Sequence, residues 1–90
     1  MNDLFKALAD PTRRAILDEL KKGEKNAGEI RDCFQITGAS ISHHMTILHN
    51  AGLVLRERRG QQIIYSLNTT VFQQLIEWIY NIKGEPNEGK

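Results

Sequence analysis

The stretch TGASISHHMTILHNAG, residues 37–52, has the spacing of an amphipathic helix whose polar face carries almost no formal charge. On a helical wheel Ile41, Met45 and Leu48 share one side. The opposite side holds short residues with little charge: Ala39, Ser42, His43, Thr46 and Asn50. A surface helix that only needs solubility usually carries Glu and Lys on this side. The pattern therefore predicts a helix whose polar face approaches a partner closely, and the absence of acidic residues favours a negatively charged partner.

The segments around this helix predict a single small domain, residues 1–84, followed by a flexible tail, 85–90. Three helices are expected before residue 37, with Asp10 and Asn26 as N-caps and Gly23 as a stop, and Thr37 is the expected N-cap of the helix that follows. After Gly52, the alternating pattern of residues 53–67 predicts a hairpin that turns at Arg59-Gly60, and a last helix begins at Asn68 or Thr69 and ends near Gly84. The expected fold is mainly α, a winged helix-turn-helix of about five helices with a two-stranded wing.

The composition sets limits on function. The chain has 90 residues, a formal net charge of +1 and one cysteine, Cys33. Positive charge is concentrated in residues 38–67. This segment contains three arginines, Arg56, Arg58 and Arg59, and one acidic residue, Glu57, which gives it a net charge of +2. No apolar run reaches the ~20 residues that cross a bilayer, so membrane insertion is not expected. A single cysteine fits a reducing cytoplasm.

An uncharged polar helix beside an arginine-rich hairpin predicts binding to double-stranded DNA. The major groove of B-DNA admits one α-helix, whose side chains read base edges, while arginines bind phosphates without sequence information. The predicted DNA-binding residues are Gly38, Ala39, Ser40, Ser42, His43, Thr46, Arg56, Arg58, Arg59, Gln61 and Gln62. His43 is the strongest single candidate for a base or phosphate contact.

Both ends of the chain carry apolar helices that predict a homodimer. The expected interface residues are Leu4, Phe5, Leu8, Phe72, Leu75, Ile76, Trp78, Ile79 and Ile82. The alternative is that the stripe of the last helix packs only on the core of its own subunit. The preceding elements already supply a core, which favours an interface between subunits.

The blocks ALADPTRRAIL, ISHHMTILHNAGLV and RRGQQIIYSLN, in this order and spacing, resemble the ArsR/SmtB family of bacterial winged-helix repressors, from about Leu4 to Ile82. The resemblance implies a homodimer that binds a short inverted repeat at its own or a neighbouring promoter. It also implies release of the DNA by an inducer, for which a small molecule and a sequestering regulatory protein both remain open. One departure is Gly38-Ala39, where many relatives carry Gln, Lys or Ser. We expect base contacts to shift towards Ser40, Ser42, His43 and Thr46.

The ligands of metal-sensing relatives are missing from the sequence. Their Cys-x-Cys pair would fall on Asn26 and Gly28, and the last helix has no His and only Glu77 as an acid. We therefore expect no metal and no cofactor, although a site between subunits remains an alternative. Cys33 is expected in the core, with Ile30 and Phe34.

The remaining polar residues have ordinary structural interpretations. His44 is expected at the rim of the core, bonded to a neighbouring helix. One of Arg13 and Arg14 is expected in solvent, and the other bonded to Asp10 or another carboxylate; which of them contacts DNA is open. Ser40 and His44 lack an acid partner and an oxyanion turn, so an enzyme is not expected. The functional alternative is a winged-helix protein-interaction module, which would have little reason to keep the wing arginines.

Overall fold

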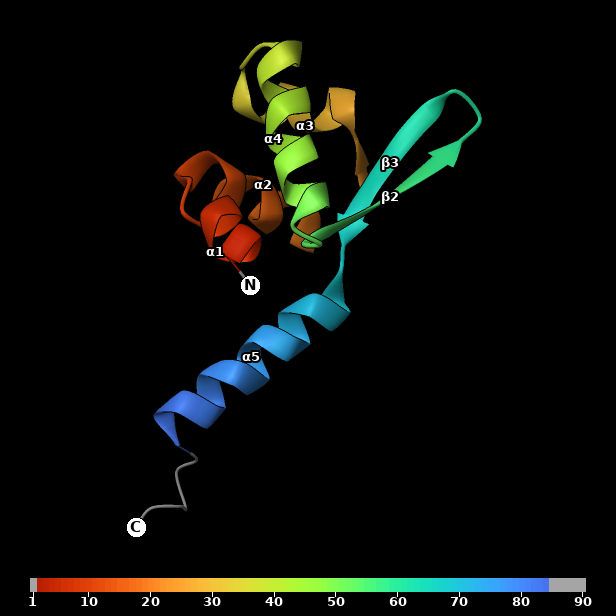
Figure 1. Ribbon diagram of the computed structural model, residues 1–90. Helices are drawn as coiled ribbons and strands as arrows, with labels where there is room; N and C mark the ends of the chain where they lie inside the picture. Colours follow the sequence, from red (N-terminus) through yellow and green to blue (C-terminus); the bar gives the residue numbers. More distant parts are fainter. Residues whose placement is uncertain (1, 85–90) are drawn as a thin grey trace.

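The computed structural model describes residues 2–84, and the tail predicted for residues 85–90 lies outside the described residues. Within these residues five helices and three strands form the predicted winged helix-turn-helix, whose arrangement Figure 1 shows. They are α1 (Asn2–Leu8), α2 (Pro11–Lys21), β1 (Lys25–Asn26), α3 (Ala27–Phe34), α4 (Gly38–Asn50), β2 (Val54–Arg59), β3 (Gln62–Leu67) and α5 (Thr69–Lys83). None of the described helices has the length and apolar character needed to cross a membrane.

The sheet has one strand more than the sequence predicts. Strands β2 and β3 form the expected hairpin, and β1 pairs antiparallel with β3 to give the order β1-β3-β2. In this short pairing Lys25 lies opposite Tyr65 and Asn26 opposite Ile64. Two residues are too few to show an alternating pattern, which explains why the sequence does not reveal β1. Its effect is to anchor one side of the hairpin to the helical body.

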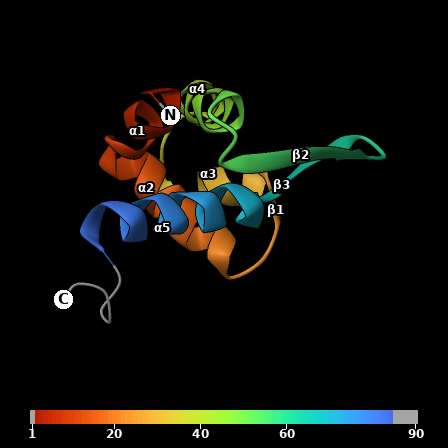
Figure 2. The same ribbon diagram turned by 60° about the horizontal axis from the view of Figure 1, so that its bottom comes forward.

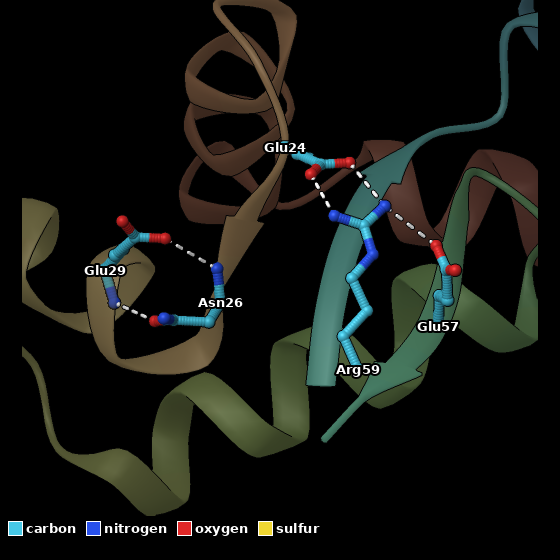
Figure 3. Close-up of polar contacts among 5 residues, drawn as sticks. All are labelled: Glu24, Asn26, Glu29, Glu57 and Arg59. Atoms are coloured by element: carbon cyan, nitrogen blue, oxygen red, sulfur yellow. Dashed lines mark hydrogen bonds and ion pairs between the residues drawn. The ribbon is translucent and has the colours of Figure 1, made fainter. Parts of the chain in front are cut away.

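Short-range caps set where three of the helices begin, at the residues predicted. The Asp10 carboxylate accepts the N–H of Arg13 at 3.0 Å, and the Thr37 hydroxyl accepts the N–H of Ser40 at 3.1 Å. Asn26 and Glu29 form a reciprocal capping box with two bonds of 2.8 Å (Figure 3). These caps satisfy N–H groups that have no partner within the helix.

The core lies between the first four helices and the base of the wing. Its fully buried side chains are Ile16, Ile30, Ile41, Met45, Leu48, Leu53 and Val54. The buried side of α4 is the one predicted from its periodicity. Leu4, only 8% exposed, belongs to this core, so it is not part of the free apolar surface that the sequence assigned to it.

Cys33 is exposed, and its predicted core position is wrong. Its sulfur lies 3.8 Å from a carboxylate oxygen of Glu19. Helix α3 has only eight residues and buries Ile30 fully and Phe34 partly. The buried stripe of such a short helix is narrow, and Cys33 falls just outside it.

Helix α5 extends away from the other helices (Figure 1), and Figure 2 shows the same helix from another side. None of its residues is buried. Val71, Phe72 and Leu75 near its start pack against the core. Further along, Ile76, Ile79 and Ile82 are 46%, 47% and 67% exposed. The interpretation that this stripe only covers the subunit's own core therefore holds for the beginning of the helix and fails for the rest.

Candidate nucleic-acid interface

The outer face of α4 is free along its whole length. Since Ile41, Met45 and Leu48 are buried, the opposite side of the helix points to solvent. The six predicted contact residues of this helix are all exposed: Gly38, Ala39, Ser40, Ser42, His43 and Thr46. The structure thus places them together on one continuous surface without an acidic residue.

An arginine that the sequence analysis missed flanks the beginning of this helix. The guanidinium of Arg31 on α3 lies near both Gly28 and Gly38. A methyl group added at Gly28 would lie 3.8 Å from one of its terminal nitrogens, and one added at Gly38 would lie 3.9 Å from the other. Its ionic contact with Asp32 is loose, at 3.8 Å. The residue is exposed, and the N-terminus of a helix already favours anions. The turn between α3 and α4 could have suggested it, since the first helix of a helix-turn-helix crosses the DNA backbone.

His44 sits at the rim of the core, as predicted, and contacts α2. Its Nδ1 lies 3.4 Å from Nη1 of Arg13. The same guanidinium donates to the carbonyl oxygens of Ala7 at 2.9 Å and Lys6 at 3.1 Å. Arg13 therefore links α1, α2 and α4, and orients the helix that bears the polar face.

Within residues 2–84 neither guanidinium, of Arg13 or Arg14, bonds to a carboxylate, which was predicted for one of them. Arg14 is exposed and donates to the carbonyl oxygen of Leu8 at 2.7 Å. The guanidinium of Arg13 donates to carbonyl oxygens, and only its backbone N–H donates to the carboxylate of Asp10. Both arginines hold the last carbonyl groups of α1, where a helix lacks internal donors. Their local role is to fix α1 on α2.

The wing places its arginines on two different faces. Gly60, with φ +62°, makes the turn between Arg59 and Gln61. Because side chains alternate along a strand, Arg56 and Arg58 share the face of their partners Tyr65 and Ile63, while Glu57 and Arg59 lie on the other. Residues 55–62 are all exposed, including Gln61 and Gln62. Arg58 donates to the carbonyl oxygen of Gly60 at 3.2 Å, which keeps its charge free.

Arg59 differs from the other two because two carboxylates surround it (Figure 3). Its guanidinium binds both oxygens of Glu24, one of them at 3.0 Å, and donates to Glu57 at 2.9 Å. The bond to Arg59 holds the pKa of Glu24 below its ordinary value, and Glu24 and then Glu57 raise the pKa of Arg59. The expected phosphate contact of Arg59 therefore competes with an existing ion pair.

Comparisons with known proteins agree on one family. A helix-turn-helix domain family matches residues 8–57. The transcriptional repressor SdpR of Bacillus subtilis is 54% identical over 81 residues, which is 90% of either chain. The chain belongs to the ArsR/SmtB family of winged-helix transcriptional repressors. This confirms the resemblance found in the sequence, and it places the chain among transcription regulators rather than enzymes.

A solved structure and a longer relative of the ArsR/SmtB family match most of this chain. An ArsR-like transcriptional regulator from Rhodococcus sp. RHA1 superposes with a TM-score of 0.84 at 26% identity, covering 91% of this chain and 77% of the other. The HTH-type transcriptional regulator NmtR of Mycobacterium tuberculosis is 38% identical over 86% of this chain but only 65% of its own length. Some relatives thus extend beyond the region that this chain matches.

Proposed function

We propose that this chain is a transcriptional repressor that binds an inverted-repeat operator as a homodimer. The observation that carries the proposal is the juxtaposition of two surfaces: the exposed polar face of α4 and the arginines of the wing. The first can read base edges in the major groove, and the second can bind the adjacent phosphates. Arg31 supplies a further cation at the beginning of α4.

The proposed contacts divide by chemistry. Ser40, Ser42, His43 and Thr46 carry the hydrogen-bonding groups for base edges. Gly38 and Ala39 allow the N-terminus of α4 to approach a phosphate, since neither has a large side chain. The backbone of the DNA is contacted by residues of the 56–62 wing: Arg56, Arg58, Gln61 and Gln62, with Arg59 able to join them only when it leaves its carboxylate partners.

Support for the homodimer comes from the exposed apolar surface of α5. Beyond its first turns Ile76, Trp78, Ile79, Tyr80 and Ile82 are exposed, an arrangement that a lone subunit would not favour. Phe5 and the partly buried Leu8, Phe72 and Leu75 would complete the interface. A winged helix-turn-helix domain from Mycobacterium bovis, described as homodimeric and 26% identical, superposes with a TM-score of 0.76 over 97% of this chain and 81% of the other. A two-fold axis would place the two copies of α4 about 34 Å apart, one turn of DNA.

We further propose that the repressor acts on its own promoter, in the cytoplasm, and responds to a signal other than a metal ion. Within residues 2–84, no three His, Cys, Asp or Glu side chains lie close enough to hold a metal. Asn26, at a position where metal-sensing relatives carry a thiolate, instead caps α3. As the relieving signal we propose a small molecule or a protein that sequesters the dimer.

The decisive experiment is a fluorescence anisotropy titration of the purified chain. The DNA is a labelled duplex from the region upstream of its own gene, and a scrambled duplex serves as control. We expect tight binding to the upstream duplex, weaker binding to the scrambled one, and a steep loss of affinity with salt. Binding to neither duplex in dilute buffer would favour the alternative of a protein-interaction module. Equilibrium dialysis of the dimer with zinc tests the alternative of a metal site between subunits.

A further inference from the structure

The three wing arginines do not have equal access to DNA, because Arg59 is already paired. Glu24 lies in the connection between α2 and β1, and Glu57 is on β2, two residues before Arg59 (Figure 3). Together they satisfy both terminal nitrogens of the guanidinium, with contacts at 3.0 Å from Glu24 and 2.9 Å from Glu57. Among residues 2–84, neither Arg56 nor Arg58 makes an ion pair. The positive charge of Arg59, at the tip of the wing, is therefore balanced by the carboxylates of Glu24 and Glu57.

We infer that Glu24 and Glu57 hold Arg59 away from the DNA, so that these carboxylates set how many phosphates the wing neutralises. The inference rests on the proposed function, since it assumes that the wing binds DNA. A phosphate and a carboxylate accept the same fork of N–H groups, so a bound duplex and Glu24 compete for one guanidinium. The two carboxylates also repel phosphates, which adds to the effect.

The ion pairs of Arg59 with Glu24 and Glu57 are weak enough for a DNA phosphate to replace the carboxylates. The side chains of Arg59, Glu24 and Glu57 are 48%, 47% and 63% exposed. Water and salt screen ion pairs at such exposure, and pairs of this kind contribute little to folding. Loss of the pair should therefore leave the fold intact and change mainly the electrostatics of the wing.

The test uses the full chain and a labelled random-sequence duplex, because phosphate contacts do not depend on sequence. We compare the parent with Glu24→Gln/Glu57→Gln, with Arg59→Gln, and with the triple variant. Affinity is measured from about 50 to 200 mM salt, the range in which phosphate contacts dominate the change. Asp18→Asn, which removes one exposed carboxylate from α2, shows the effect of losing a single negative charge outside the wing.

The double carboxylate variant should bind about three- to tenfold more tightly, with a salt slope steeper by about 0.9, the value for one added phosphate contact. In the Arg59→Gln background the same substitutions should yield little of this gain. Asp18→Asn should change affinity much less.

Three results would overturn the inference. An equal gain in the Arg59→Gln background would mean that the carboxylates act only through their own charge. Weaker binding by the double variant would mean that the ion pair orients the wing for DNA. If the parent binds no duplex even at the lowest salt, the proposed function itself fails and the inference fails with it.

Discussion

The ring of Phe5 on α1 lies with its centroid 5.5 Å from that of Trp78 on α5, at an interplanar angle of 51°. This contact joins the first helix to the last, yet the two residues remain 41% and 39% exposed. An aromatic pair of this geometry stabilises by about 0.5–1.5 kcal/mol. Because it orients α5 while leaving its apolar side uncovered, it prepares a surface that a second copy of the chain could bury.

We expect Ile79→Glu to dissociate the proposed homodimer. The substitution places a charge within the apolar side of α5 in both copies, and each copy also loses about 1.5–3 kcal/mol of apolar burial. Light scattering after gel filtration should show a dimer for the parent and a monomer for the variant. Gln73→Glu, on the opposite polar face, should remain dimeric. A parent chain that is monomeric at every concentration would contradict the proposal.

Ser42→Ala combined with His43→Ala should remove discrimination between operator and random DNA. Both side chains are exposed on the outer face of α4, and each good base contact contributes about 1–3 kcal/mol to specificity. Binding to the random duplex should change little, since phosphate contacts remain. The measurement is the ratio of the two dissociation constants at fixed salt. If the ratio equals that of the parent, other residues read the bases.

Arg58→Ala should weaken binding to all duplexes alike. Its guanidinium carries no ion pair within the described residues and bonds only to the carbonyl group of Gly60. Loss of one phosphate contact reduces the salt slope by about 0.9. Arg58→Lys keeps the charge and should retain most of the slope. A loss confined to the operator would assign Arg58 to base or minor-groove contacts instead.

The pH dependence of stability should contain a contribution from Asp10. The N–H of Arg13, which donates to its carboxylate, lowers the pKa of Asp10 below its ordinary 3.8. A lowered folded-state pKa means that the stabilisation is complete above the ordinary value and is lost as pH falls through the lower one. The parent should therefore melt at a higher temperature than Asp10→Asn at neutral pH, and the difference should shrink as the solution is acidified below pH 3.8. A difference that stays constant with pH would show that the charge of Asp10 is not involved.

Gln35→Gly should stabilise the fold. Gln35 ends α3 with φ +54°, in the left-handed region that costs side-chain-bearing residues about 1 kcal/mol or more. Glycine relieves this strain but adds freedom to the unfolded chain, so we expect a net gain of about 0.5 kcal/mol in the free energy of unfolding. Gln35→Ala keeps the Cβ atom and should show no such gain. Urea unfolding of the three proteins provides the comparison, and equal values for Gly and Ala would contradict the argument.

Much of the interface could be predicted because the relevant signals are local. The phase of α4 follows from the spacing of Ile41, Met45 and Leu48, and its start follows from the Thr37 cap. The exposed positions of Ser42 and His43 are a direct consequence. The errors have a different origin. Cys33 and Leu4 were misplaced because the width of a buried stripe depends on what packs against the helix, which periodicity does not report.

By itself, the sequence determined where the main helices begin, which side of α4 faces solvent, and that the positive charge accompanies it. Those properties depend on residues a few positions apart, and caps and periodicity encode them directly. Only the tertiary structure decided that β1 joins the sheet, that Arg31 lies beside Gly38, and that Arg59 meets Glu24 from 35 positions away. Such partners are selected by the folded arrangement of whole elements, because burial and geometry, rather than neighbourhood along the chain, decide which charged groups come within reach of one another.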